Sequence, residues 1–289
     1  LPFEPPHFGP GATVGGMVAA GLSGPARASV GAVRDYLLGV VLINGRAELL
    51  TFGGQVMKNV AGYDVSRLMA GAWGTLGLLT EVSLKVLPVA PAEATLRFEC
   101  NQADALRKLH AWGGQPLPLN ASCWVEDAGV GQLYVRLRGA VAAVDAACKS
   151  MGGTRLDNAT AAPDWQACRE QTLPWFAARL ARPGQALWRL SLPATAPVLA
   201  LPGGVSPLVE WHGALRWVQA PASAGDALRA AAEAVGGSAS VFVAASADVE
   251  SASGQFDPKS AALAKIHARV KQAFDPAGIF NPGRLAAAW

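Results

Sequence analysis

Cysteine and histidine are scarce in this sequence, and neither has the spacing of a metal site. The four cysteines lie 20 to 25 residues apart without a CxxC pair, and the four histidines form no HxH or HExxH motif. Zinc knuckles, iron–sulfur clusters and helical zinc sites need such short spacings because neighbouring ligands converge on one ion. We therefore expect buried free thiols and no metal site.

Long apolar runs and charged tails are absent as well. No apolar run approaches the ~20 residues that span a bilayer, and residues 1–30 lack the charged-then-apolar order of a signal peptide. Lys and Arg nearly balance Asp and Glu throughout, with 6 against 5 in residues 1–90, 13 against 12 in 91–245 and 5 against 4 in 246–289. Proteins that bind nucleic acid usually concentrate their basic residues. We expect a cytoplasmic protein that binds no nucleic acid.

Hydrophobic residues, by contrast, are abundant, at 51% against 16% charged residues. A chain of 289 residues with this balance folds and is long enough for roughly two domains. Pro88 and Pro91 follow a strand-like run and mark the predicted boundary. We expect one domain over residues 1–90, a second over 91–245, and a C-terminal helix and tail over 246–289. The sequence starts at Leu1 within a motif, so we expect a truncated N-terminus.

The first 90 residues predict a helix, a hairpin, a short helix and further strand. Thr13 is placed to cap a helix that ends at Leu22. Asn44-Gly45 is typical of a type I′ turn between two apolar runs. The predicted elements are the helix 13–22, the strands 37–43 and 47–52, the helix 63–69, and the strand-like runs 76–80 and 82–87.

The rest of the chain alternates strands and helices. Two strand–strand–helix modules, each ending in a Gly-Gly pair, predict one antiparallel sheet backed by helices, and hence an α+β domain. The predicted strands are 95–99, 122–126, 133–138, 187–192, 208–211 and 215–219, and the predicted helices are 103–112, 141–151, 164–173, 226–235 and 260–274. Residues 161–201 are rich in Trp and Pro. Their indoles either fill the core or form a docking surface, which would lie around residues 164–176.

Two glycine-rich stretches are candidates for ligand binding. Thr13–Gly21 and Gly71–Thr80 place hydroxyls and small residues where backbone N–H groups can meet a phosphate or a ring edge. The alternative for the first stretch is a tight packing loop, and for the second a β-bulge or loop entry. Neither stretch matches GxGxxG or GxxxxGK[ST], which excludes the usual Rossmann and P-loop sites.

Taken with other motifs, these stretches resemble the FAD-linked oxidase family of the vanillyl-alcohol-oxidase type. The supporting motifs are Val33–Gly39, Lys58–Asp64, Asp275–Gly278 and Asn281–Arg284. Within the family, the motifs 5–9, 53–64 and 215–217 are most similar to the smaller FAD-binding subunits of bacterial glycolate oxidases, also called glycolate dehydrogenases. The resemblance implies an α+β fold, with the second lobe of an FAD domain in 1–90 and an α+β cap domain with an antiparallel sheet in 91–245. The first lobe of that FAD domain has no counterpart here, and we expect it to be missing.

The resemblance also implies which residues bind FAD. The first stretch would follow the pyrophosphate and ribityl chain, Gly74 to Leu79 would meet the flavin or adenine, and the tail would return to the FAD domain through Asn281 and Arg284. The alternatives are a solvated surface lysine at position 58 and a simple C-terminal cap at the tail. The expected FAD-binding residues are Thr13, Val14, Gly15, Gly16, Ala19, Gly21, Gly24, Gly31, Arg34, Asp35, Lys58, Asn59, Gly74, Thr75, Leu76, Gly77 and Leu79.

As function, the resemblance implies an FAD-dependent oxidoreductase subunit that oxidises glycolate to glyoxylate. Its partners would be a larger FAD-binding subunit and an iron–sulfur subunit that receives electrons from the flavin, with at most peripheral membrane contact through the complex. The sequence has no HGDGN-type metal motif, so no catalytic residue can be named. One alternative is a non-catalytic scaffold of the same complex with a vestigial or weak flavin site. A free-standing FAD oxidase for another small hydroxy acid or alcohol is the other.

Overall fold

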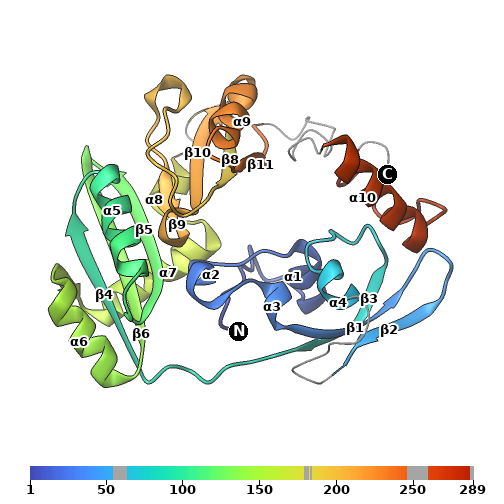
Figure 1. Ribbon diagram of the computed structural model, residues 1–289, viewed down its shortest axis with the longest axis horizontal. Helices are drawn as coiled ribbons and strands as arrows, with labels where there is room; N and C mark the ends of the chain where they lie inside the picture. The colour runs from blue at the N-terminus through green and yellow to red at the C-terminus, as the bar shows by residue number, and fades with distance from the viewer. Residues whose placement is uncertain (55–63, 179–181, 183, 246–259, 287–289) are drawn as a thin grey trace. The chain divides into compact units, whose positions relative to one another are not determined.

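Helices and antiparallel sheets form two compact units in the computed structural model, which describes residues 1–54, 64–178, 182, 184–245 and 260–286 (Figure 1). The first unit comprises Leu1–Ser23, Gly31–Leu87 and Glu250–Trp289, and the second comprises Gly24–Val30 and Pro88–Val249. Each unit has a sheet of its own. None of the described helices is long and apolar enough to cross a bilayer.

The first unit contains a three-stranded antiparallel sheet in the order β2-β1-β3. Its strands are β1 (Leu37–Ile43), β2 (Leu49–Gly53) and β3 (Leu78–Leu84). The predicted hairpin is therefore confirmed. The two strand-like runs 76–80 and 82–87 form one strand, because Glu81 pairs with Val41 and carries the ladder across the expected break.

The hairpin turn differs from the predicted type I′ turn. Asn44 N donates to Glu48 O at 3.1 Å, which leaves a three-residue loop, and the positive φ of 59° falls on Ala47 instead of Gly45. A different constraint explains Gly45. A Cβ there would lie 2.7 Å from the Cα of Asp275, so the C-terminal segment requires a glycine at this position.

Short helices and one longer helix complete the first unit. They are α1 (Val14–Ala20), α3 (Val33–Tyr36), α4 (Val65–Met69) and α10 (Ala261–Phe274). Thr13 caps α1 as predicted, since its Oγ1 accepts a hydrogen bond from Gly16 N at 3.0 Å. The helix ends at Ala20, earlier than predicted, because Gly21 adopts a left-handed conformation with φ of 67° and terminates it.

The second unit is built on an eight-stranded sheet in the order β11-β8-β10-β9-β5-β6-β4-β7, whose strand pairs are all antiparallel. The predicted antiparallel sheet is confirmed. Its strands are β4 (Ala92–Glu99), β5 (Leu119–Asp127), β6 (Val130–Gly139), β7 (Thr154–Leu156), β8 (Gln185–Ser191), β9 (Leu208–Glu210), β10 (Leu215–Pro221) and β11 (Ser238–Val243).

Helices pack on this sheet through side chains that alternate along the strands. The α-helices are α2 (Arg27–Val30), α5 (Gln102–Gly113), α6 (Val141–Met151), α7 (Asn158–Glu170), α8 (Pro174–Ala177) and α9 (Gly225–Glu233). On β6, Leu133, Val135 and Leu137 pack with α5 and α6, whereas Tyr134 packs with α7 and α8. Short 3-10 turns cover Pro202–Gly204, Trp211–Gly213 and Ala222–Ala224.

The Trp-rich segment contributes mainly to the core. Its Trp165 and Trp188 are buried, and its Trp175 is half-buried beside α7. Farther along the chain, Trp211 and Trp217 are buried as well. The helix predicted over 164–173 begins earlier, at Asn158, because the Asp157 carboxylate caps it by accepting from Thr160 N at 3.1 Å. Of the two interpretations of these indoles, packing in the core accounts for most of them.

Candidate functional site

A cavity of about 380 Å³ lies in the first unit and brings the two glycine-rich stretches together. Its walls come from the start of α1, the loop between α4 and β3, the start of β3 and the C-terminal tail. The lining residues are Thr13, Gly15, Gly16, Ala19, Met69, Ala72, Gly74, Leu76, Gly77, Leu78, Leu79, Phe280 and Asn281. Eight of the expected FAD-binding residues are among them.

Gly15 lines the cavity at a point where there is open space beside the backbone. A Cβ on Gly15 would meet no protein atom within 4 Å, and the backbone there has no positive φ. The protein's own packing therefore does not require a glycine at this point. The open space leaves room for a bound group to approach the backbone closely at this wall of the cavity.

Gly74 and Gly77, in contrast, are required by the protein itself. Gly74 has φ of 66°, and a Cβ on it would lie 2.8 Å from Asn281 Nδ2. Gly77 has φ of 155°, and its Cβ would lie 2.7 Å from the carbonyl oxygen of Ile43. These two glycines let the loop fold closely against β1 and the tail, which forms the second wall of the cavity.

The C-terminal tail is tied to this loop through Trp73. Asn281 Nδ2 donates to the carbonyl oxygen of Trp73 at 2.7 Å, and the Arg284 guanidinium carbon lies 4.7 Å from the centre of the Trp73 ring. Cation–π contacts of this kind stabilise by ~0.5–1 kcal/mol at exposed sites. The tail thus contacts the first unit through both residues that the sequence assigned to it.

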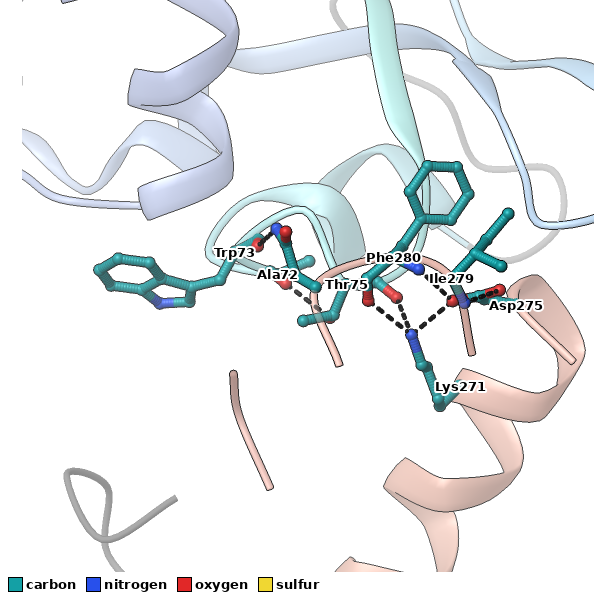
Figure 2. Close-up of polar contacts among 8 residues, drawn as sticks. Ala72, Trp73, Thr75, Lys271, Asp275, Ile279 and Phe280 are labelled. Carbon is teal, nitrogen blue, oxygen red and sulfur yellow. Dashed lines mark hydrogen bonds and ion pairs between the residues drawn. The ribbon is translucent and has the colours of Figure 1, made fainter. Parts of the chain in front are cut away.

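One buried lysine joins the tail, the loop and α10, as Figure 2 shows. Lys271 Nζ donates to the carbonyl oxygens of Thr75 and Phe280, both at 2.8 Å, and to Asp275 Oδ2 at 2.6 Å. A lysine side chain has three donors, and each of them has an acceptor here. The lysine therefore fixes two walls of the cavity relative to each other.

Asp275 completes this network on the tail side. Its carboxylate accepts from the backbone N–H groups of Ile279 at 3.1 Å and Phe280 at 2.8 Å. Burial by itself would raise the pKa of Asp275, but the hydrogen bonds from Lys271 and from these N–H groups lower that pKa below its usual value. The carboxylate is thus held ionised at the turn that delivers Phe280 to the cavity.

Several expected FAD-binding residues do not line this cavity. Val14 is exposed, and Gly21 packs against Gly71. Thr75 is buried and uses its hydroxyl to bond Ala72 O at 2.7 Å. Gly24 belongs to the second unit, where its carbonyl oxygen accepts from Trp211 Nε1 at 3.0 Å.

The segment that contains Gly31, Arg34 and Asp35 forms the start of α3. Asp35 Oδ2 accepts from Ala32 N at 2.8 Å, and a Cβ on Gly31 would lie 2.9 Å from that same carboxylate oxygen. Arg34 is exposed. None of the three lines the cavity, whereas Lys58 and Asn59 lie outside the described residues.

Five lining residues were not among the individually expected FAD-binding residues, although Leu78 lies within the expected stretch Gly74 to Leu79. Met69, Ala72 and Leu78 are apolar and carry no chemical signal of their own, and Phe280 and Asn281 lie about 200 positions from the stretches that they face. Asn281 belongs to a motif that was linked to the FAD domain in general but not to the cofactor wall. Only the fold brings these residues to the cavity.

A second cavity, of about 480 Å³, lies in the second unit beside α7 and α8. Trp165, Trp175, Cys123 and Cys168 are among its lining residues. Behind it, buried Glu210 accepts from Cys168 Sγ at 3.1 Å and from Trp217 Nε1 at 2.6 Å. Burial raises the pKa of Glu210 to about 7, although these hydrogen bonds oppose the shift.

Comparison of the sequence with known proteins shows which family the chain belongs to. Residues 256–285 match the family described as FAD linked oxidases, C-terminal domain. The chain is 46% identical over 287 residues to the glycolate oxidase subunit GlcE of Escherichia coli. This alignment covers 99% of this chain and 75% of GlcE. It is also 35% identical over 93 residues to the glycolate oxidase subunit GlcD of Bacillus subtilis, covering 32% of this chain and 20% of that protein.

Solved structures agree at the level of the fold. Two crystal forms of alkyldihydroxyacetonephosphate synthase superpose with TM-scores of 0.60 and 0.61 at 14% identity, covering 98% and 96% of this chain but only 60% and 59% of the synthase. The α+β architecture expected from the resemblance is confirmed. Because the match to GlcE includes nearly every residue here and three quarters of that relative, the chain belongs to the FAD-linked oxidase family that contains GlcE.

Proposed function

We propose that this chain is the FAD-binding subunit of a glycolate-oxidising complex and that the 380 Å³ cavity holds part of the FAD. The open space at Gly15 is the observation that carries the proposal, because nothing in the protein's own packing accounts for a glycine there. The 46% identity to a protein named as a glycolate oxidase subunit supports it.

The lining suits a dinucleotide cofactor in two ways. Gly15 and Gly16 let a phosphate approach the backbone closely, as glycine-rich loops do in other cofactor sites. Leu76, Leu79 and Phe280 supply apolar surface that would exclude water from a flat ring system. The remaining expected FAD-binding residues, including Lys58 and Asn59, are proposed to contact the cofactor beyond this cavity.

For the chemistry, FAD when bound supplies the acceptor for the electrons taken from the hydroxy acid. The chain's own residues would bind and orient the cofactor and keep water from it. We propose further that residues 1–90 with the tail form the FAD lobe, that 91–245 form a cap, and that a larger FAD subunit and an iron–sulfur subunit complete the complex. The names of GlcE and GlcD, both glycolate oxidase subunits, support the multi-subunit assembly.

A variant that fills the open space at Gly15 tests the FAD site. Gly15→Leu should fold normally, because no protein atom lies within 4 Å of the new Cβ, yet its side chain would occupy the cavity. The variant is co-expressed with the larger flavin subunit, and the flavin absorption of the purified complex is measured. We expect the complex to lose most of the flavin that this chain binds and to keep the flavin of the larger subunit.

Gly113→Leu is the matched control. Gly113 is also a helical glycine with nothing within 4 Å of its Cβ position, but it ends α5 and does not line this cavity. The control should keep its flavin. If Gly15→Leu retained the same flavin content as Gly113→Leu, the cavity would not be the FAD site.

One observation favours a second candidate, the non-catalytic scaffold. Among the described residues that line the cavity, only Thr13 and Asn281 carry polar side chains, and neither is a base at neutral pH. A subunit that assembles with its partners, yet contributes no flavin to the complex, would establish the scaffold.

A further inference from the structure

The 480 Å³ cavity of the second unit has aromatic walls and takes no part in the proposed FAD site. Trp165 from α7, Trp175 from α8 and Tyr134 from β6 line it. Cavities of about 300–1,000 Å³ with mainly apolar and aromatic linings are typical binding sites for small organic molecules. This cavity therefore has the size and the surface of such a site.

Buried hydrogen bonds hold parts of this lining in place. Trp165 Nε1 donates to Thr95 Oγ1 at 2.9 Å, which fixes the indole of α7 against β4. Cys168, a buried lining residue, donates from Sγ to the carboxylate of Glu210 at 3.1 Å. Walls that are already ordered reduce the entropy that a ligand loses on binding. The cavity is thus formed before a ligand enters it.

Two half-buried lining side chains have hydrogen-bonding groups that the protein does not use. In the part of the chain that the structure describes, neither the Tyr134 hydroxyl nor Trp175 Nε1 forms a hydrogen bond. The buried indoles of Trp165 and Trp217, by contrast, both donate to side chains of the protein. The phenol and the Trp175 indole are therefore available to a ligand.

The charges around the cavity favour a cation over an anion. All charged side chains among its described lining residues are acidic, namely Glu126, Asp127 and Asp164. Their carboxylates form no hydrogen bond or ion pair with any described residue. All three residues are exposed, so they lie at the open side of the cavity, where charge of one sign attracts a ligand of the other.

Two of these acids lie near the aromatic wall. Burial raises the pKa of Tyr134, and the nearby charge of Arg97 opposes that rise. The charges of Asp164 and Asp127 raise the pKa further. Carboxylates that act on the phenol in this way are close enough for one small ligand to contact both a ring and an acid.

Two arginines lie close to the cavity without lining it. The Arg136 guanidinium carbon is 4.9 Å from the centre of the Trp165 ring, and Arg136 Nε donates to Asn120 Oδ1 at 2.7 Å. Arg97 is exposed on β4. Neither residue is among those that line the cavity, so neither places its charge on the lining itself.

We propose that this cavity binds a small organic cation, a protonated amine that carries a flat aromatic group. The ring would pack against Trp165 and Trp175, and the ammonium group would donate to Asp164 and Asp127 at the open side. Indole and phenol rings also attract a cation through their faces. This site uses only residues of the second unit and goes beyond the proposed function.

Calorimetric titration of the full, flavin-free chain with tryptamine tests this site, because tryptamine joins an indole ring to an amine that is protonated at neutral pH. We expect saturable binding. Tryptophol, in which a hydroxyl replaces the ammonium group, should bind ~10-fold more weakly, since it lacks the charge-assisted hydrogen bonds. Indole-3-acetate, which carries a carboxylate instead, should bind more weakly still.

Two variants separate the acidic side from the aromatic wall. Asp127→Asn/Asp164→Asn should weaken tryptamine binding ~10-fold and leave tryptophol binding unchanged, because only tryptamine is charged. Trp175→Leu should weaken both ligands by ~5-fold, since it removes an aromatic face. Glu81→Gln/Glu233→Gln is the matched control. It also removes two exposed carboxylates, neither of which lines the cavity, and should bind tryptamine as the parent does.

The outcomes are distinct from those of the FAD experiment. Tryptamine that does not bind the parent, tryptamine affinity unchanged in Asp127→Asn/Asp164→Asn, or indole-3-acetate that binds as tightly as tryptamine would overturn the proposal. Thermal melting of each variant confirms that it is folded. A chain that contributes flavin to the complex but does not bind tryptamine would contradict this site alone. A chain that binds tryptamine but contributes no flavin would contradict only the FAD site.

Discussion

At the scale of residues, single buried polar groups hold this molecule's candidate sites together. Lys271 satisfies two carbonyl oxygens and one carboxylate, from the loop at Thr75 and from the tail. Glu210 accepts from a thiol and an indole in the second unit. Both groups are buried, so removing a partner leaves a polar or charged group without compensation. Their substitution should therefore have large and specific effects.

Lys271→Met should destabilise the first unit. The variant keeps the length and apolar stem of the side chain but leaves the Asp275 carboxylate buried without its cation. We expect the free energy of unfolding to fall by about 3 kcal/mol, measured by urea denaturation. Lys265→Met, on the exposed face of the same helix, should change it by less than ~0.5 kcal/mol. Equal effects of the two substitutions would contradict a structural role for the network.

Glu210→Gln should change how stability depends on pH. The folded protein holds the pKa of Glu210 at about 7, above its usual 4.5, so the folded state keeps a proton that the unfolded chain releases. This contribution to stability is complete below the usual pKa and is lost as the pH rises through about 7. The Glu210→Gln variant has no such titration. The difference between its free energy of unfolding and that of the parent should therefore shift in its favour by roughly 2 kcal/mol from about pH 5 to about pH 8. Parallel stability curves for the two proteins would show that Glu210 titrates normally.

At the scale of elements, short-range signals predicted the pieces of the first unit well. The Thr13 cap, the strand 37–43 and the helix 260–274 all follow from residues within a few positions of each other. The hairpin turn does not. Gly45 is needed because Asp275, from the other end of the chain, packs against it, and no local pattern could reveal that contact.

The α1 cap provides a test at this scale. Thr13→Ala removes the acceptor for Gly16 N, and we expect it to lower the free energy of unfolding by ~1 kcal/mol. Thr13→Ser keeps the hydroxyl and should restore most of that loss. Thermal denaturation of the three proteins measures the difference. If the serine variant were as unstable as the alanine variant, the hydroxyl would not be the stabilising group.

At the scale of the whole molecule, the chain divides into two units with separate sheets, and the FAD proposal concerns a cavity of the first unit. The chain also spans three quarters of GlcE and three fifths of the synthase structures. Its activity is therefore best examined in the assembled complex.

Flavin stoichiometry in that complex decides between the flavoprotein and the scaffold. If this chain binds FAD, the complex with the larger flavin subunit should hold one more flavin than that subunit alone, and Gly15→Leu should remove it. Quantification of released FAD by absorbance measures both. An assembled complex with no additional flavin would support the scaffold instead.

Sequence patterns were enough to predict the family, the α+β class and eight of the residues that line the cavity, because glycine-rich turns and caps act over a few neighbouring positions. The other lining residues and contacts depend on the fold. Met69 and Phe280 became walls of one cavity, and Arg27 and Arg189 came to flank Trp211, because packing joins segments that are up to about 200 residues apart. Apolar and singly charged side chains have no local signature, so their roles depend on which partners the fold places beside them.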